Sequence, residues 1–269
     1  MLAFGIGDFF VIDNTTFADK GVVVYSFKDE LVNEFVLNFL LPFRQAYIAD
    51  ENLEDGLAHK DWDCREEAIG EQLPTKASLR SGEFSEILLY YLSICFRCPD
   101  ANVKPLKWRW KENQDQPCHL SDIVMMKCED PEHPSKEDYM YVVESKSKAI
   151  PPSRNSNSSV MNNAIKGAVK DYASRSGKMI AYLRKWYNRE GRHDIVKKVK
   201  RFGDSVNVDY DKRYHAAIVV DRDSLQHHIV NIDANLLQKA QDKQIGLVAV
   251  PIAGMKDVYE RMYKDVVKY

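Results

Sequence analysis

The sequence predicts an α/β protein in which helices flank a central mixed β-sheet, with an N-terminal α/β extension. Three short apolar runs, at residues 139–143, 214–220 and 245–252, have the length and composition of buried strands. A polar loop at 129–138 joins the first run to another strand-like segment, and strands joined this way pair antiparallel. The 269 residues, of which 45% are hydrophobic and 29% charged, suffice for one large domain or two small ones.

The N-terminal extension is predicted to span residues 1–77 and to offer a candidate partner-binding surface. Two short apolar runs, separated by turn signals, predict two strands at its start. Apolar residues at helical spacing then predict a helix over 27–43 that closes near Pro42. Residues 49–78 are polar and acidic, which predicts an irregular connector or short helices. This segment is either a solvated surface or a surface that binds a partner.

A second unit, residues 78–269, carries the remaining strands and the C-terminal helices. Its predicted helices span 81–97, 159–202 and 254–269, and its predicted strands span 103–111, 119–128, 139–148, 214–220 and 245–252. Ser81 is predicted to cap the first helix, so that Glu83 falls in the first turn, where the helix dipole favours a negative charge. Glu83, Glu86 and Tyr90 then lie along one narrow stripe of that helix.

Composition and charge exclude several classes of protein. The chain has 38 Lys and Arg against 40 Asp and Glu, and its net charge of −2 argues against holding nucleic acid through bulk charge. No run approaches the ~18 uncharged apolar residues that cross a bilayer, and the N-terminus lacks the regions of a signal peptide. We therefore expect a cytoplasmic protein with no membrane segment, in which a local patch or a partner holds any nucleic acid.

The five cysteines, an odd number, fit a reducing compartment better than a set of disulfides. Cys95 and Cys98 form a C-x-x-C pair, and Cys118 and Cys128 follow, so that a zinc site is an alternative. The second pair is ten residues apart, unlike the usual spacing of zinc ligands. We therefore predict that Cys95 and Cys98 are small buried residues near a helix end.

The strand-like segments on either side of the polar loop bring acids together. Side chains alternate along a strand, so Glu144 and Lys146 point to the same side at the end of their strand. If the turn is centred near His133, Asp122 lies opposite Glu144, on an otherwise apolar face. Two carboxylates placed in this way repel each other unless a cation lies between them. Oxygen ligands alone favour Mg²⁺ or Mn²⁺ over zinc.

Two further side chains complete the predicted constellation. Lys146, about 7 Å along the strand from Glu144, can stabilise charge on a scissile phosphate. Glu83 can supply a third carboxylate from its helix. Taken alone, Glu144 and Lys146 form an ordinary surface ion pair, Asp122 a turn or cap residue, and Glu83 a partner of the helix dipole. The combination predicts a metal-dependent nuclease with Glu83, Asp122, Glu144 and Lys146 as its catalytic residues.

The order and spacing of these residues resemble the PD-(D/E)xK nuclease superfamily. The segments Ser81–Glu86, His119–Ile123 and Val143–Lys148 resemble the HamA family, the nuclease subunit of the Hachiman anti-phage defence system. The resemblance runs from about Ser78 to the C-terminus. It implies a restriction-endonuclease-like core. Ser121 stands where the superfamily motif has a proline or another residue.

The resemblance also implies the roles of the site residues. Asp122 and Glu144, together with the carbonyl of Ser145, would bind the metal, and Lys146 would be the catalytic lysine. Glu83 matches the acidic residue of the first core helix, which makes it a further candidate ligand. The expected cofactor is Mg²⁺, or Mn²⁺ in its place.

The expected partners are DNA and, from the resemblance, a superfamily 2 helicase of the HamB kind encoded beside the chain. The sequence contains no G-x-x-x-x-G-K-S/T phosphate loop, so we expect this chain to bind no ATP. Candidate contacts to the DNA backbone are the basic residues Lys148, Lys166, Lys170, Arg184, Lys185, Lys197, Lys198, Lys200 and Arg201. A solvated helix face explains the helical members of this set equally well.

We therefore expect a metal-dependent DNA endonuclease or nickase that acts as the effector of a bacterial anti-phage complex. One alternative is a restriction or repair nuclease of the same fold that acts alone. Another is a non-catalytic, nuclease-like subunit that binds and restrains its partner. Metal-dependent cleavage, and its dependence on the helicase, distinguish the three hypotheses.

Overall fold

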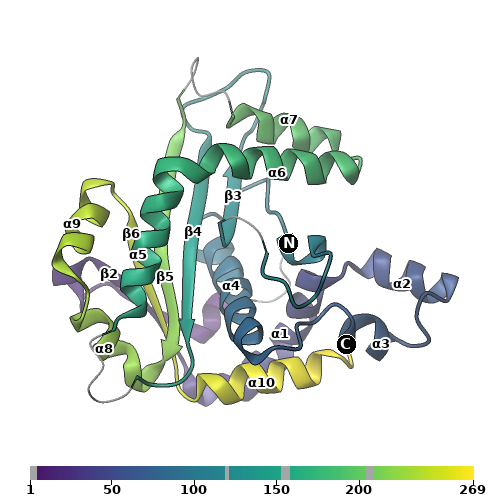
Figure 1. Ribbon diagram of the computed structural model, residues 1–269, viewed down its shortest axis with the longest axis horizontal. Helices are drawn as coiled ribbons and strands as arrows, with labels where there is room; N and C mark the ends of the chain where they lie inside the picture. Colours follow the sequence, from purple (N-terminus) through teal and green to yellow (C-terminus); the bar gives the residue numbers. More distant parts are fainter. Residues whose placement is uncertain (1–4, 119–120, 153–157, 204–208) are drawn as a thin grey trace.

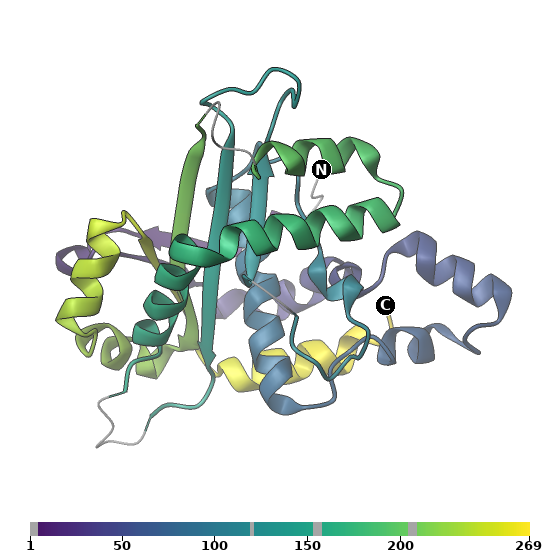
Figure 2. The ribbon, with the colours of Figure 1, turned by 45° about the horizontal axis from the view of Figure 1, so that its top comes forward.

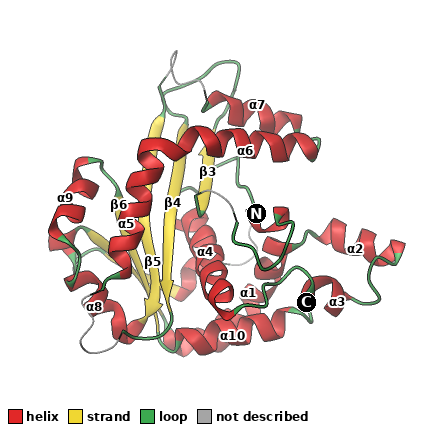
Figure 3. Ribbon diagram, in the orientation of Figure 1, coloured by secondary structure: helices red, strands yellow, loops and turns green. Residues whose placement is uncertain are grey.

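A computed structural model describes residues 5–118, 121–152, 158–203 and 209–269, and helices cover both faces of its sheet (Figures 1 and 3). Within these residues six strands form one mixed sheet in the order β1-β2-β6-β5-β4-β3. Their bounds are Phe10–Asp13 (β1), Val22–Phe27 (β2), Ile123–Lys127 (β3), Tyr139–Lys148 (β4), Asp211–Asp221 (β5) and Gly246–Ile252 (β6). The four inner strands run parallel, and β1 and β3 pair antiparallel at the two edges. The predicted α/β class with a mixed sheet is therefore confirmed.

Alternate side chains of the strands enter two separate apolar cores. On β4, Tyr141 and Val143 face one core, whereas Met140 and Val142 face the other. The first core is covered by α1 (Val32–Tyr47), α4 (Ala77–Phe96) and α10 (Met255–Val266). The second is covered by α5 (Val160–Lys170), α6 (Ser176–Arg189), α7 (His193–Arg201) and α9 (Ala234–Asp242). Figure 2 shows α5 lying along the sheet and continuing into α6.

The remaining elements are short. They are the helices α2 (Asp50–His59), α3 (Arg65–Gly70) and α8 (Leu225–Val230), the 3₁₀ turns Ile6–Phe9, Ala18–Lys20, Asp29–Leu31, Lys107–Trp110 and Arg222–Ser224, and the π-helical turn Asp171–Arg175. The prediction of short helices within 49–78 is confirmed by α2 and α3. Sequence analysis missed α8 and α9, although Asp233 caps α9 through a hydrogen bond from the Leu236 amide. No helix in the described part of the chain is long and apolar enough to cross a membrane.

The N-terminal 77 residues share their sheet and their core with the rest of the chain. The strand β2 pairs in parallel with β6, and Val22 stands beside Leu247. Aromatic side chains of α1 pack against later helices, with Phe43 at 5.1 Å from Tyr263 between ring centroids. The N-terminal region therefore extends one continuous framework rather than sitting beside it.

Two helix boundaries differ from the prediction. The helix α1 passes through Pro42 and ends at Tyr47, because Phe43 and Tyr47 after the proline are buried in the core. Tertiary packing outweighs the helix-breaking effect of the proline here. The helix α4 begins at Ala77, so Ser81 lies inside it and does not cap it. Glu83 consequently falls beyond the first turn, where the helix dipole does not account for its charge.

The predicted strand over 103–111 is wrong. Val103 makes one isolated bridge to Met126, and Lys107–Trp110 forms a 3₁₀ turn. The sequence alternates there because Trp108 is buried in the first core and Trp110 in the second. The following strand, β3, begins only at Ile123, and residues 119–120 of the predicted strand lie outside the described residues.

Candidate active site

The hairpin of β3 and β4 brings Asp122 beside Glu144. Ile123 pairs with Val143, which is the register predicted from a turn centred near His133. Asp122, immediately before β3, is fixed to the opposite strand, since its Oδ2 accepts a hydrogen bond of 2.7 Å from the Ser145 amide. The short antiparallel connection therefore sets the separation of the two acids.

The Lys146 ammonium lies where oxygens from three residues converge. Its Nζ is 2.6 Å from Glu144 Oε1, 2.9 Å from the Ser145 carbonyl and 3.7 Å from Asp122 Oδ2. The Glu144 side chain is 8% exposed and that of Asp122 is 15% exposed. A positive charge thus occupies the point at which two shielded carboxylates and a carbonyl meet.

Electrostatics at this point favour a cation. Burial raises the pKa of Glu144, and the negative charge of Asp122 raises it further, against the hydrogen bond from Lys146. Burial alone would lower the pKa of Lys146, but the charges of Asp122 and Glu144 outweigh it and raise that pKa. The two acids therefore repel each other, and the lysine stays protonated between them.

The acid of α4 that faces this site is Glu86. Lys107 from the 3₁₀ turn lies between Glu86 and Asp122, with its Nζ at 3.1 Å from Glu86 Oε2 and 3.9 Å from Asp122 Oδ1. Glu83 instead binds Lys111 at 2.7 Å and the Tyr47 hydroxyl at 2.9 Å. The structure thus brings Asp122, Glu144 and Lys146 together and gives Glu83 other partners.

A second cation reaches Glu144 from the π-helical turn that follows α5. Arg175 Nη1 is 3.6 Å from Glu144 Oε2 and 2.9 Å from Asp171 Oδ1. Asp171 is buried, and its burial raises its pKa against a hydrogen bond with Ser121 and the charge of Arg175. Such π turns occur frequently at functional sites. Sequence analysis missed both residues, although an acid and an arginine four apart on a helix are a recognisable pair.

The close approach of α5 to β4 depends on Gly167. A Cβ placed on Gly167 would overlap the Cγ, Cδ and Oε1 atoms of Glu144. The missing side chain lets the helix backbone lie directly against the carboxylate. Gly167 is therefore part of the wall of the site, and sequence analysis did not single it out.

The predicted DNA-contacting residues lie in several places. Lys148, Lys166 and Lys170 are exposed on β4 and α5. Lys197 and Lys198 belong to α7, where Lys197 Nζ is 3.8 Å from Glu132 in the hairpin loop. That loop is at the opposite end of β4, roughly 20 Å from Glu144 by the usual rise of a strand. These five residues stay predictions, and the two on α7 are remote from the acids.

Arg201 does not fit a DNA-contacting role. Its guanidinium is buried, with Nε at 2.9 Å from Asp138 Oδ2 and Nη2 at 3.1 Å from the Ser135 carbonyl. It ties the end of α7 to the hairpin loop. The prediction that Arg201 contacts the DNA backbone is therefore wrong, and Arg201 forms a structural ion pair with Asp138 instead.

The donors at the hairpin fit a hard divalent cation. Two carboxylates and a main-chain carbonyl are ligands that Mg²⁺ and Mn²⁺ prefer, and the Lys146 ammonium already marks their meeting point. Over the described ranges, no three or more His, Cys, Asp or Glu side chains form a metal-binding group. Any metal here would rest on Asp122, Glu144 and the Ser145 carbonyl, with other positions left to water or substrate.

The same observation gives the zinc alternative no support within the described residues. Cys95, Cys98, Cys118 and Cys128 form no such group where the structure describes the chain. Cys98 is buried as predicted, but Cys95 is exposed. Burial raises the pKa of the Cys98 thiol to about 12, as for a small buried side chain.

Glu86 should make stability depend on pH. Burial raises the pKa of Glu86 from 4.5 to about 7. The positive charge of Lys107 lowers this pKa, and the negative charge of Asp122 raises it. The folded chain then holds this proton more tightly than the unfolded chain, so the free energy of unfolding falls as pH rises from 4.5 to about 7. In Glu86→Gln the free energy of unfolding should no longer show this pH-dependent fall, which is on the order of 3 kcal/mol in wild type and is measured by urea unfolding. Glu260→Gln, at an exposed position of α10, is the matched control. An identical dependence of the unfolding free energy on pH in wild type and Glu86→Gln would contradict the assignment.

Comparison with known proteins gives the family. A search of curated proteins finds no match to this chain. The family model for HamA, in contrast, matches residues 8–266. The match includes the β3–β4 hairpin and all the site residues described above. It also covers nearly all of the N-terminal region, so it extends well beyond the segments whose motifs resemble that family. The chain therefore belongs to the HamA family of the Hachiman defence system.

Proposed function

We propose that this chain is a divalent-metal-dependent DNA endonuclease or nickase and the effector of its defence complex. One observation carries the proposal. The Lys146 ammonium, Glu144, Asp122 and the Ser145 carbonyl converge at one point, within 2.6 to 3.7 Å of the lysine nitrogen. A structural role alone gives no reason to bury two repelling carboxylates beside a lysine at the end of a strand.

The metal ligands in this proposal are Asp122, Glu144 and the Ser145 carbonyl. When bound, Mg²⁺ or Mn²⁺ would neutralise the two acids and withdraw electrons from a phosphodiester. The Ser145 amide orients Asp122 through its hydrogen bond, which leaves the other carboxylate oxygen of Asp122 directed toward Lys107. The hairpin thus presents an acidic surface that is already in register before substrate arrives.

The two cations beside Glu144 have separate tasks in this proposal. Lys146 keeps its proton, because the neighbouring acids raise its pKa, and it can donate hydrogen bonds to a phosphate oxygen. The planar Arg175 guanidinium, held by Asp171, can donate hydrogen bonds to a second phosphate oxygen. Asp171 acts through Arg175 and is a positioning residue.

A superfamily 2 helicase is the proposed partner, and DNA is the proposed substrate. The sequence has no phosphate loop of its own, so ATP hydrolysis would be supplied by the partner. The N-terminal region exposes large apolar side chains, Val11 and Ile12 on the edge strand β1 and Leu37 and Leu41 on α1. Such exposed apolar groups support a partner-binding role for residues 1–77.

Plasmid cleavage tests the proposal. Purified chain with its helicase, ATP and Mg²⁺ should nick or cut plasmid DNA, and EDTA should stop the reaction. Glu144→Ala combined with Lys146→Ala should abolish cleavage and phage protection while the chain stays folded and bound to the helicase. Lys127→Ala, which removes an ion-paired lysine from the other strand of the same hairpin, is the matched control.

The outcomes separate the alternatives. Cleavage that survives in the double variant would refute the site. Efficient and selective cutting by the isolated chain would favour a nuclease that acts alone. Complete absence of metal-dependent cleavage, with wild-type helicase binding and restrained helicase activity, would favour a non-catalytic regulatory subunit.

A further inference from the structure

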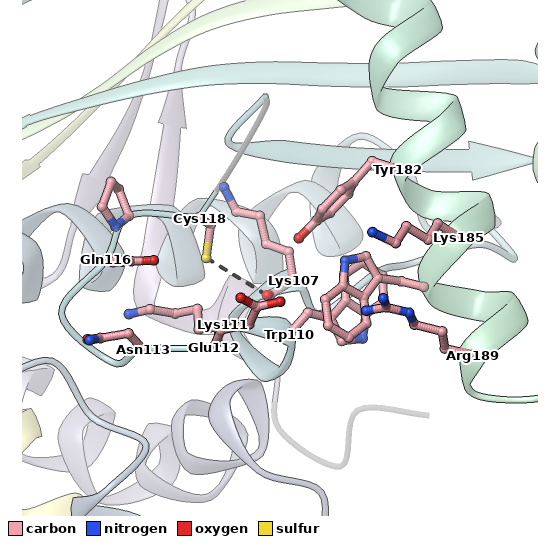
Figure 4. Close-up of a pocket in the computed structure, with 12 residues that line it drawn as sticks. Lys107, Trp110, Lys111, Glu112, Asn113, Gln116, Cys118, Tyr182, Lys185 and Arg189 are labelled. Atoms are coloured by element: carbon pink, nitrogen blue, oxygen red, sulfur yellow. Dashed lines mark hydrogen bonds between the residues drawn. The ribbon is translucent and has the colours of Figure 1, made fainter.

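A hollow beside the acidic hairpin has the chemistry of a nucleotide-binding site. It lies between α6 and the segment that leads from the 3₁₀ turn toward β3 (Figure 4), and its volume is about 180 Å³. Its walls contain the aromatic side chains Trp110, Tyr182 and Trp186, together with Lys185 and Arg189. We call this hollow the aromatic pocket.

The aromatic side chains form a rigid platform. The rings of Trp110 and Trp186 are stacked, with centroids 5.6 Å apart and planes inclined by 1°. Tyr182 meets the Trp110 ring edge-on at 6.1 Å, and Glu190 holds the Trp110 indole through a hydrogen bond of 2.6 Å. Trp186 and Tyr182 remain partly exposed. Trp110 covers one face of Trp186, and fixed, partly exposed aromatic side chains of this kind are those on which unpaired bases stack.

The cations of the pocket differ in how they are neutralised. Lys107 is paired with Glu86, and Lys111 with Glu83. Lys185 and Arg189 are exposed, and over the described residues neither side chain makes an ion pair or a hydrogen bond. Arg189 lies 5.0 Å from the centre of the Trp186 ring. The exposed carboxylate of Glu112 also lines the pocket, so in the described part of the chain its two cations without an ion pair outnumber its one such acid. Cations beside an aromatic platform suit phosphates attached to a stacked base.

The aromatic pocket adjoins the candidate active site. Lys107 and Tyr182 line both this pocket and a small cavity of about 20 Å³ that reaches Asp122. The Lys107 ammonium is itself 3.9 Å from Asp122. The pocket and the acids are therefore adjacent, so that one strand can reach both.

We propose that the aromatic pocket binds one unpaired nucleotide of the DNA strand that enters the active site. The base would stack beside Trp186 and Tyr182, and the adjoining phosphates would contact Lys185 and Arg189. A volume of about 180 Å³ suits a single base, and the pocket opens to solvent where the rest of the strand would continue. The choice of DNA rests on the proposed nuclease function, and it narrows the substrate to single-stranded or locally opened DNA.

Binding without cleavage tests the pocket separately from the nuclease function. The full chain is titrated in EDTA with a fluorescently labelled twelve-nucleotide oligo(dT) and with a duplex of equal length. The wild type should prefer the single strand. Trp186→Leu should weaken oligo(dT) binding about 5- to 100-fold. Unlabelled oligo(dT) should quench tryptophan emission in the wild type and quench it less in Trp186→Leu.

A second variant, with two charge reversals, tests the pocket even if Trp186→Leu misfolds. Lys185→Glu with Arg189→Glu changes only exposed side chains. It should reduce by about 1.4 the steepness with which the logarithm of the oligo(dT) binding constant falls with the logarithm of the salt concentration. Lys239→Glu with Lys264→Glu, on exposed positions of α9 and α10, changes the net charge equally and should leave binding unaltered.

Three results would overturn the proposal. In the first, wild type and both pocket variants bind oligo(dT) with equal affinity. In the second, the wild type prefers the duplex. In the third, the pocket variants no longer bind the helicase but still bind oligo(dT). The last would identify the pocket as a docking surface for the partner. If plasmid cleavage fails under every condition while these variants still lose oligo(dT) binding, the nuclease proposal falls and the pocket stands.

Discussion

Lys146→Met should slow DNA cleavage by the helicase complex about 10²- to 10³-fold and should at the same time tighten metal binding. In the proposed reaction the ammonium would stabilise charge on the phosphate, so its loss should lower the rate. It also occupies the meeting point of Glu144 Oε1 and the Ser145 carbonyl, at 2.6 and 2.9 Å. Without it, a divalent cation meets two acids that have lost their shared counter-charge, while Arg175 remains 3.6 Å from Glu144 and Lys107 3.9 Å from Asp122.

Two measurements check this split. Initial rates of plasmid nicking give the loss of activity, and the rise in melting temperature with added Mn²⁺ reports metal binding without any need for turnover. Glu144→Gln should lose both the activity and the Mn²⁺-dependent rise. Lys127→Met on β3 is the matched control and should change neither. A smaller Mn²⁺-dependent rise in Lys146→Met than in wild type would show that the lysine does not compete for the ligand oxygens.

Gly167→Ala should disrupt the site from the helix side. The added methyl group would overlap the Glu144 carboxylate, so that α5 must shift or Glu144 must leave its position. Overpacking of this kind costs about 1–3 kcal/mol, which urea unfolding measures directly. Cleavage should fall as well, because Arg175 and Glu144 can no longer meet with the same geometry.

Gly177→Ala is the control for this substitution. Gly177 lies in the next helix, α6, and a Cβ placed there meets nothing within 4 Å. Alanine should therefore stabilise the chain by about 0.5–1 kcal/mol through helix propensity. If Gly167→Ala also stabilised the chain and preserved cleavage, the close approach of α5 to Glu144 would have no functional importance.

The hairpin geometry was predictable from the sequence because local constraints determine it. A polar loop of limited length, flanked by apolar runs with period two, admits few registers, and Ile123 opposite Val143 is the register it favours. The position of Asp122 beside the Glu144 strand follows directly. The buried strands β5 and β6 were predictable for a similar reason, since their continuous apolar runs suit a parallel sheet covered on both faces.

The surroundings of the hairpin were not predictable in the same way. Whether Glu83 or Glu86 faces Asp122 depends on the rotation of α4 against the sheet, which packing decides and the local sequence does not. The 3₁₀ turn of Lys107–Trp110 has the alternating pattern of a strand because its two tryptophans enter different cores. Arg175 reaches Glu144 through a π-helical turn, for which the sequence carries no specific signal.

The position of β4 within the sheet has a consequence for synthesis of the chain. Asp122 and Ser145, which hydrogen-bond across the hairpin, are only 23 residues apart, so the acids can meet early during translation. The β4 backbone then offers an open apolar edge until β5 emerges and pairs with it from Tyr139 to Lys148. The strand β2 is made near the start of the chain, but its parallel partner β6 is made only near the end. An incomplete chain would thus hold the acids in register on an unprotected sheet, and only near-complete synthesis supplies β6 to complete that sheet.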